Sequence, residues 1–250
     1  MSGHSKWSSI KHKKGAADAK RGALFTKLAR AIQVAAREGG GDPVGNATLG
    51  NAVQKAKDAR MPKDNIERAI AKGTGADADA EAFENMLYEG YGPGGVAILV
   101  EALTDNRNRT GSEVRHLFTR HGGSLGEPGS VAWVFEKRGV VLVDAERYSE
   151  DDLMPAIDAG AEDVVLDENV FEVLSDPAGL QGVRRAIEEA GVEIQSAEIT
   201  MRPTSRVELP EERVGTLLHL VESLEDDDDV VAVHANFDVD AAVLERVAAA

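Results

Sequence analysis

A stretch rich in Gly, Ala and Asp at residues 73–82 separates two parts of the chain that have different hydrophobic periodicities. Before this stretch, apolar residues recur every three to four positions, as they do in amphipathic helices. After it, short runs rich in β-branched residues alternate with helical segments. The sequence therefore predicts a helical N-terminal domain, a linker and a larger α+β region.

The N-terminal part is predicted to form a three-helix bundle over residues 1–75. Its helices are expected at residues 16–37, 48–60 and 62–73. In the first helix, Leu24, Leu28 and Ile32 share one arc when residues are placed about 100° apart, and most of the cations lie on the opposite arc. Thr48 is the expected N-cap of the second helix, because its hydroxyl can accept a hydrogen bond from a backbone N–H.

A strand–helix–strand–strand–helix–strand order at residues 137–203 is typical of a ferredoxin-like unit. Its strands are expected at residues 140–143, 163–166, 170–174 and 193–201, and its helices at 150–159 and 177–190. We interpret this unit as a domain inserted into a second α+β domain. That host domain is formed by residues 76–136 and 204–240, and residues 241–250 are a tail.

The host domain is expected to contain strands at residues 96–103, 131–135 and 230–239 and a helix at 211–225. Thr110 and Glu113 have the spacing of a capping box in front of a further helix. The predicted fold class is thus α+β with three domains. These are an N-terminal three-helix bundle and two α+β domains of the ferredoxin-like βαβ type, one inserted in the other.

Residues 4–28 form a basic block in an otherwise acidic chain. The block holds seven Lys and Arg and one acid, Asp18, whereas the whole chain has a formal net charge of -16. Residues 1–73 carry 15 Lys and Arg against 6 Asp and Glu (net +9), and the remainder carries 13 against 38 (net -25). Because Lys and Arg neutralise phosphates, this asymmetry indicates a polyanion-binding end and a repelling remainder.

Most predicted nucleic-acid contacts lie in this block and on the third helix. They are Lys6, Trp7, Lys11, His12, Lys13, Lys14, Lys20, Arg21, Lys27, Lys63 and Arg68. For Trp7 two roles stay open, namely stacking on an unpaired base and packing against a neighbouring part of the protein.

A second predicted contact follows an expected strand and opens the helix at Thr110. It consists of Asn106, Arg107, Asn108 and Arg109. Arg and Asn donors suit phosphates and base edges, and a helix N-terminus adds backbone N–H groups for an anion. The alternative is an internal clamp, in which the arginines pair with acidic groups of the protein itself.

Three motifs that could suggest an enzyme or a metal site do not meet the requirements of either. Ser124 lies in a G-x-S-x-G match, but a helix precedes it and a strand follows, the reverse of a nucleophile elbow. Glu113 and His116 have a metal-binding spacing without a second copy on a facing helix. The acidic run 225–229 lacks the alternating ligands of a calcium loop and is expected to be solvated. We expect no catalytic residue, metal, cofactor or small-molecule substrate.

The sequence contains no cysteine, which fits a reducing compartment. It has no run of 18 apolar residues that could span a bilayer, and its N-terminus lacks the apolar segment of a secretory signal. The expected location is cytoplasmic, with no membrane partner.

Four stretches carry a resemblance to a known family. They are GHSKWSSIKHKKGAADAKRGALFTKL, ARMPKDNIERAIAKGTG, YEGYGPGGVAILVEALTDNRNRT and EVRHLFTRHGGSLGEPGSVAWVF. Together they resemble the YebC/PmpR family, which includes mitochondrial translational activators. The resemblance implies three domains, a cytoplasmic or organellar location and no catalytic activity. It also implies either a transcriptional regulator or a ribosome-associated translation factor.

The sequence thus predicts a non-enzymatic, nucleic-acid-binding regulator of gene expression. We expect its partner to be ribosomal RNA within the ribosome, because so acidic a chain needs a confined docking site where only its basic end faces phosphate. The alternative is a DNA-binding transcriptional regulator that acts on promoter DNA.

Overall fold

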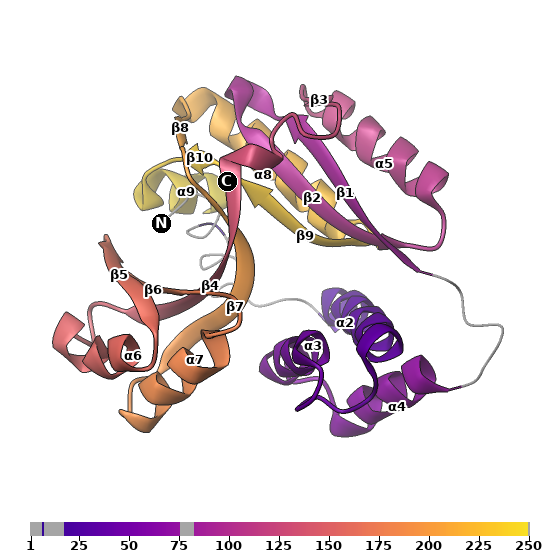
Figure 1. The fold of residues 1–250 in the computed structure, drawn as a ribbon. Coiled ribbons are helices and arrows are strands. Elements are labelled where there is room, and N and C mark those ends of the chain that lie inside the picture. The colour runs from indigo at the N-terminus through magenta and orange to yellow at the C-terminus, as the bar shows by residue number, and fades with distance from the viewer. Residues whose placement is uncertain (1–6, 8–17, 76–82, 250) are drawn as a thin grey trace. The chain divides into compact units, whose positions relative to one another are not determined.

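The computed structural model describes Trp7 and residues 18–75 and 83–249. Residues 135–205 form one compact unit, and the described residues on either side of them form a second. The helical segment, the host sheet and the inserted sheet each have a main hydrophobic core of their own. The fold is α+β with three domains, one inserted in another, as the sequence predicted (Figure 1).

The N-terminal domain is a bundle of three helices, α2, α3 and α4. These helices are α2 (Asp18–Gly39), α3 (Ala47–Asp58) and α4 (Lys63–Thr74). Leu28 and Ile32 are buried in its core, but Leu24, expected on the same arc, is 41% exposed. The N-cap of α3 is Asn46 and not Thr48. The Asn46 side chain accepts a hydrogen bond from the backbone of Leu49, and it also donates to two carbonyls at the end of α2.

The host domain contains a four-stranded antiparallel sheet in the order β3-β1-β2-β9. The strands are β1 (Glu84–Tyr91), β2 (Ala97–Thr104), β3 (Ser124–Leu125) and β9 (Val230–Ala235). Helices α5 (Arg107–Arg120) and α8 (Glu211–Asp226) pack on the face that presents Ile98 and Val100. The smaller elements are η1 (Pro93–Gly95), η2 (Ala132–Val134), the parallel pair β8 (Val207–Glu208) and β10 (Phe237–Asp238), and α9 (Ala241–Ala249).

Two host-domain elements differ from expectation. Strand β1 was not predicted from the sequence, because its buried residues do not alternate cleanly with exposed ones. The strand expected at residues 131–135 is a 3-10 turn, and the next strand begins only at Phe135.

The elements of the inserted domain follow one another along the chain in the ferredoxin-like order. Its four strands form an antiparallel sheet in which the spatial order is β5-β6-β4-β7. Its elements are β4 (Phe135–Asp144), η3 (Glu150–Leu153), α6 (Met154–Asp158), β5 (Ala161–Asp167), β6 (Val170–Ser175), α7 (Leu180–Glu189) and β7 (Ile194–Pro203). Its core joins Val141 and Val173 of the sheet to Val183 and Ile187 of α7. None of the helices in the described ranges has both the length and the apolar character that crossing a bilayer requires.

Helix α5 begins four residues earlier than the capping box at Thr110 predicted. The Asn106 side chain accepts a hydrogen bond from the backbone N–H of Arg109 and so acts as the N-cap. Thr110 consequently lies in the first turn, where its side chain is fully buried. This shift places Arg107, Asn108 and Arg109 inside the helix instead of in a loop before it.

Candidate nucleic-acid interface

The helical domain presents several of the predicted phosphate contacts on its surface. Arg21 at the start of α2 and Arg68 on α4 are exposed. Lys63 is also exposed, and its ammonium lies 3.4 Å from Glu67 one turn along the helix. Such an exposed pair contributes little to stability, so Lys63 can exchange its partner for a phosphate at low cost. Lys6, Lys11, His12, Lys13, Lys14 and the side chain of Lys20 lie outside the described residues.

Lys27, another predicted contact, is half-buried against the end of α8. Its Nζ donates a hydrogen bond to the carbonyl of Glu225 over 2.6 Å. Burial lowers the pKa of Lys27, although the nearby carboxylates of residues 225–228 act in the opposite direction. Arg30, one turn further along α2, lies 3.4 Å from a carboxylate oxygen of Asp229. These two cations therefore face protein groups in this structure.

Trp7 is also enclosed by protein. Only 5% of its surface is exposed, and it belongs to the core of the host domain with residues such as Phe237 and Leu244. The structure thus shows Trp7 packed inside the protein, which is one of its two possible roles. The residues around it belong to the host domain and not to the helical bundle. A ring in this position cannot stack on a base without leaving the core.

The N-terminal end of α5 borders a polar hollow of about 520 Å³. Arg107 and Asn108 line this hollow together with Tyr88 of β1. The guanidinium of Arg107 is 64% exposed and lies 3.7 Å from Glu84. Asn106 also lines the hollow, but its side-chain oxygen is occupied as the helix cap. Arg107 and Asn108 are therefore the members of this predicted group whose side chains are available to an external ligand.

Arg109 instead forms the internal clamp that the sequence left open as an alternative. Its guanidinium donates hydrogen bonds to Asp105 over 2.8 Å and to Asp229 over 2.7 Å. The carboxylate of Asp229 is buried and also accepts hydrogen bonds from the hydroxyls of Thr104 and Thr110. Burial alone would raise the pKa of Asp229, but these hydrogen bonds outweigh burial and hold the pKa below its ordinary value.

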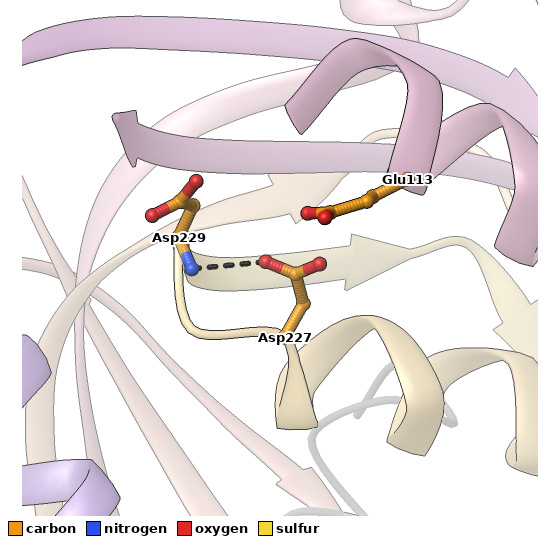
Figure 2. A group of neighbouring side chains, drawn as sticks. All are labelled: Glu113, Asp227 and Asp229. Carbon is orange, nitrogen blue, oxygen red and sulfur yellow. Dashed lines mark hydrogen bonds between the residues drawn. The ribbon is translucent and has the colours of Figure 1, made fainter. Parts of the chain in front are cut away.

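The sequence predicted that the acidic run 225–229 would be a solvated loop. The structure shows that this prediction is wrong for part of the run. Glu225 and Asp226 end α8, and Asp229 is buried. Figure 2 shows Asp227 and Asp229 beside Glu113 of α5, and carboxylate oxygens of the three lie within 4.8 Å of one another. The oxygens of Asp229 already bind protein donors, and Arg109 supplies the compensating charge. Asp229 thus belongs to an ion-pair and hydrogen-bond network with Arg109 and Thr110 that joins α5 to the start of β9.

Glu89 is a buried acid that the sequence analysis missed. Its carboxylate accepts hydrogen bonds from the backbone N–H groups of Gly129, Val131 and Ala132 over 2.6–2.7 Å. Burial acts to raise the pKa of Glu89, and these three hydrogen bonds lower it further than burial raises it. The residue holds the loop that precedes the inserted domain. No motif marks this role, because the donors are main-chain groups about 40 positions away.

Among the described residues, Ser124 has no hydrogen-bonded base of the kind that a nucleophile requires. It lies on β3, directly after α5 and its glycines, so the helix-then-strand order expected from the sequence is present. Within residues 18–75 and 83–249, no histidine or carboxylate is hydrogen-bonded to its hydroxyl. Activation of a serine hydroxyl depends on a base within hydrogen-bond reach.

Comparison with known proteins identifies the family. Residues 5–76 match the description "TACO1/YebC protein N-terminal domain", and residues 83–237 match "TACO1/YebC second and third domain". The chain belongs to the TACO1/YebC family. These matches confirm the resemblance that its basic N-terminal stretch and its TDNRNRT segment suggested.

Relatives with similar sequences span the whole chain. A probable transcriptional regulatory protein of Rubrobacter xylanophilus is 56% identical over 99% of this chain and 100% of its own length. A protein of the same description from Desulfotalea psychrophila is 57% identical with the same coverage. The crystal structure of a conserved hypothetical protein from Aquifex aeolicus has a TM-score of 0.78 and 48% identity, and the match covers 89% of this chain and 92% of that one.

Proposed function

We propose that this member of the TACO1/YebC family is a non-enzymatic regulator of gene expression that binds nucleic acid through its N-terminal domain. The observation that carries the proposal is the net charge of +9 on residues 1–73, in a chain whose remainder has -25. The cations at Arg21, Lys63 and Arg68 are exposed on the helical bundle. A polyanion is the partner that such a surface attracts, and the acidic remainder keeps it at this end of the chain.

Duplex DNA is the first target we propose. Relatives more than 50% identical over the full chain are named as probable transcriptional regulatory proteins. Trp7 is buried, so it supplies no stacking contact that would favour the unpaired bases of RNA over duplex DNA. Ribosomal RNA remains the second candidate, because the net charge of -25 outside the N-terminal domain favours a confined docking site.

A competition experiment at fixed salt distinguishes these targets. Promoter duplexes, structured ribosomal RNA fragments and intact ribosomes would compete for the full-length protein. A preference of about tenfold for duplex with dependence on its sequence supports transcription, since specific sites commonly exceed non-specific ones by at least this factor. A preference of the same size for intact ribosomes over duplex DNA would instead support ribosomal RNA as the target.

The salt dependence of binding tests the phosphate contacts themselves. If the five lysines of the basic block other than Lys27 each meet a phosphate, the slope of log affinity against log salt is expected to be about -3.5 to -4.5. Replacing Lys11, Lys13 and Lys14 by Ala should reduce its magnitude by about 2 to 2.7. The matched control is Arg185→Ala, which removes an exposed cation from α7 of the inserted domain. A slope near zero for both DNA and RNA would remove the basis of the proposal.

A further inference from the structure

The outer side of α5 carries a continuous stripe of polar side chains. Asn108, Ser112, Arg115 and Thr119 follow one another at intervals of four, three and four residues, and all are exposed. At about 100° per residue, the four side chains fall within about 60° of one another. Val114 and Phe118, which lie about 60–160° around the helix from the stripe, pack into the host core. The stripe therefore points away from the domain.

The charge of α5 is opposite to that of its surroundings. Its 14 residues contain four arginines and one acid, Glu113. These are four of the 13 Lys and Arg in the whole of residues 74–250, where 38 acids give a net charge of -25. Arg107 and Arg109 have acidic neighbours, but Arg115 and Arg120 form no ion pair with any residue in the described ranges. Arg115 and Arg120 are both exposed, so their guanidinium groups can pair with a phosphate or a base edge.

The acids near α5 do not face the stripe. Glu113 lies about 100–160° around the helix from the stripe, given the helical repeat, and it is Glu113 whose carboxylate approaches Asp227 and Asp229 (Figure 2). At the N-terminal end of α5, Glu84 is paired with Arg107 and Asp105 with Arg109. A polyanion that approached the stripe would therefore meet donors first, with the nearest acids either paired or turned away.

The chemistry of the stripe is that of direct base readout. An Arg guanidinium can bind O6 and N7 of guanine together, and an Asn amide can bind N6 and N7 of adenine. The hydroxyls of Ser112 and Thr119 donate to backbone carbonyls one turn earlier, over 2.8 and 2.9 Å, so their lone pairs remain free to accept. Those lone pairs suit the amino groups of cytosine and adenine. The stripe thus combines donors and acceptors, as sequence readout requires.

The dimensions also fit. An α-helix with its side chains is about 10–12 Å wide, and the major groove of B-DNA is about 12 Å wide. From Asn108 to Thr119 the helix rises about 16 Å, which corresponds to about five base-pair steps. Figure 1 shows α5 along the outside of the host sheet. One face of α5 can therefore lie in a groove while the other remains packed on the domain.

We infer that α5 is a recognition helix, whose stripe Asn108–Ser112–Arg115–Thr119 reads base edges in the major groove of duplex DNA. Arg107 and Arg120 at its two ends are placed to contact the flanking phosphates. The inference rests on the proposed function, and it assigns sequence specificity to the host domain and non-specific affinity to the basic N-terminal domain.

The test uses the full-length protein and a pool of DNA duplexes with a random central segment. Sequences enriched by the wild type are compared with the unselected pool, and the ratio of the two affinities measures specificity. Arg115→Ala is expected to lower this ratio by about 5- to 150-fold, the range for one bidentate base contact. Arg115→Lys keeps the charge. It should remove most of the specificity ratio, while the affinity for the unselected pool stays unchanged. Arg185→Ala is the control and should leave the ratio unchanged.

The outcomes separate this inference from the proposed function. If the Arg115 variants keep the wild-type ratio, or if the wild type enriches no sequence, α5 is not a recognition helix although the protein binds nucleic acid. The same conclusion follows if structured RNA competes about tenfold better than the enriched duplex, a margin that specific recognition commonly exceeds. If the wild type shows no salt-dependent affinity for either polymer, both proposals fail. Asn108→Ala is a second substitution in the stripe. Thermal melts of each variant show whether a decrease in the specificity ratio results from misfolding.

Discussion

The guanidinium of Arg109 lies 2.7 Å from the buried carboxylate of Asp229, although the two residues are 120 positions apart in the sequence. This contact joins the first turn of α5 to the residue that precedes β9. The hydroxyls of Thr104 and Thr110 complete the set of hydrogen bonds to the same carboxylate. Because a buried charge is costly unless it is paired and hydrogen-bonded, the orientation of α5 depends on this network.

The first prediction concerns the hydroxyl of Thr110. Thr110→Val keeps the shape of the side chain but removes a hydrogen bond to a buried carboxylate, and should lower the free energy of unfolding by about 1.5–3 kcal/mol. Denaturant unfolding measures this change. Ser112→Ala on the exposed side of the same helix is the control and should stay within about 0.5 kcal/mol of wild type. Equal effects of the two substitutions would mean that the bond to Asp229 is not important for stability.

The second prediction separates two neighbouring arginines. Arg109→Ala leaves Asp229 without its main cation, so the melting temperature should fall while the affinity for nucleic acid per folded molecule stays unchanged. Arg107→Ala loses only an exposed ion pair at 3.7 Å, so stability should stay and affinity should fall. Thermal melts and binding curves on the same samples test both. The reverse pattern would show that Arg109, and not Arg107, faces the ligand.

The third prediction concerns pH and Glu89. Its pKa is lower in the folded protein than in the unfolded chain, so its stabilising contribution is fully present above the unfolded pKa of about 4.3 and disappears as the pH falls through the folded pKa. Asp229 acts in the same direction over a range that begins near pH 4. Unfolding measured at a series of acidic pH values should show stability falling on acidification. Glu89→Gln should make this fall shallower, and an unchanged slope would contradict the assigned role.

The fourth prediction concerns the two tryptophans. Trp7→Ala should cost about 3–5 kcal/mol, because it removes a large buried ring. Trp133→Ala should stay within about 0.5 kcal/mol, because that ring is 73% exposed. In a Trp133→Phe background, only Trp7 contributes tryptophan fluorescence, and saturating nucleic acid should leave this emission unquenched. Strong quenching would show that Trp7 leaves the core to stack on a base.

Much of the fold follows from local pattern. The apolar periodicity of the helices, the strand order of the inserted domain and the glycines that end helices are all visible in the residues. The inserted domain, expected at residues 137–203, forms a compact unit at residues 135–205. The errors fall where a local signal was ambiguous, as at β1, or where two caps competed. Asn106, and not Thr110, is the N-cap of α5. The Thr110 hydroxyl instead donates a hydrogen bond to Asp229, which lies far along the chain.

The sequence by itself determined the charge asymmetry, the class of fold and the family, because these are properties of composition and of short-range pattern. Only the tertiary structure decided which charged and aromatic groups remain available to a partner. Arg107 and Arg109 are two residues apart and chemically identical, yet one faces a hollow and the other a buried carboxylate. Trp7, among lysines in the sequence, lies in a hydrophobic core. The physical reason is that burial and ion pairing depend on contacts between distant segments, which no local pattern specifies.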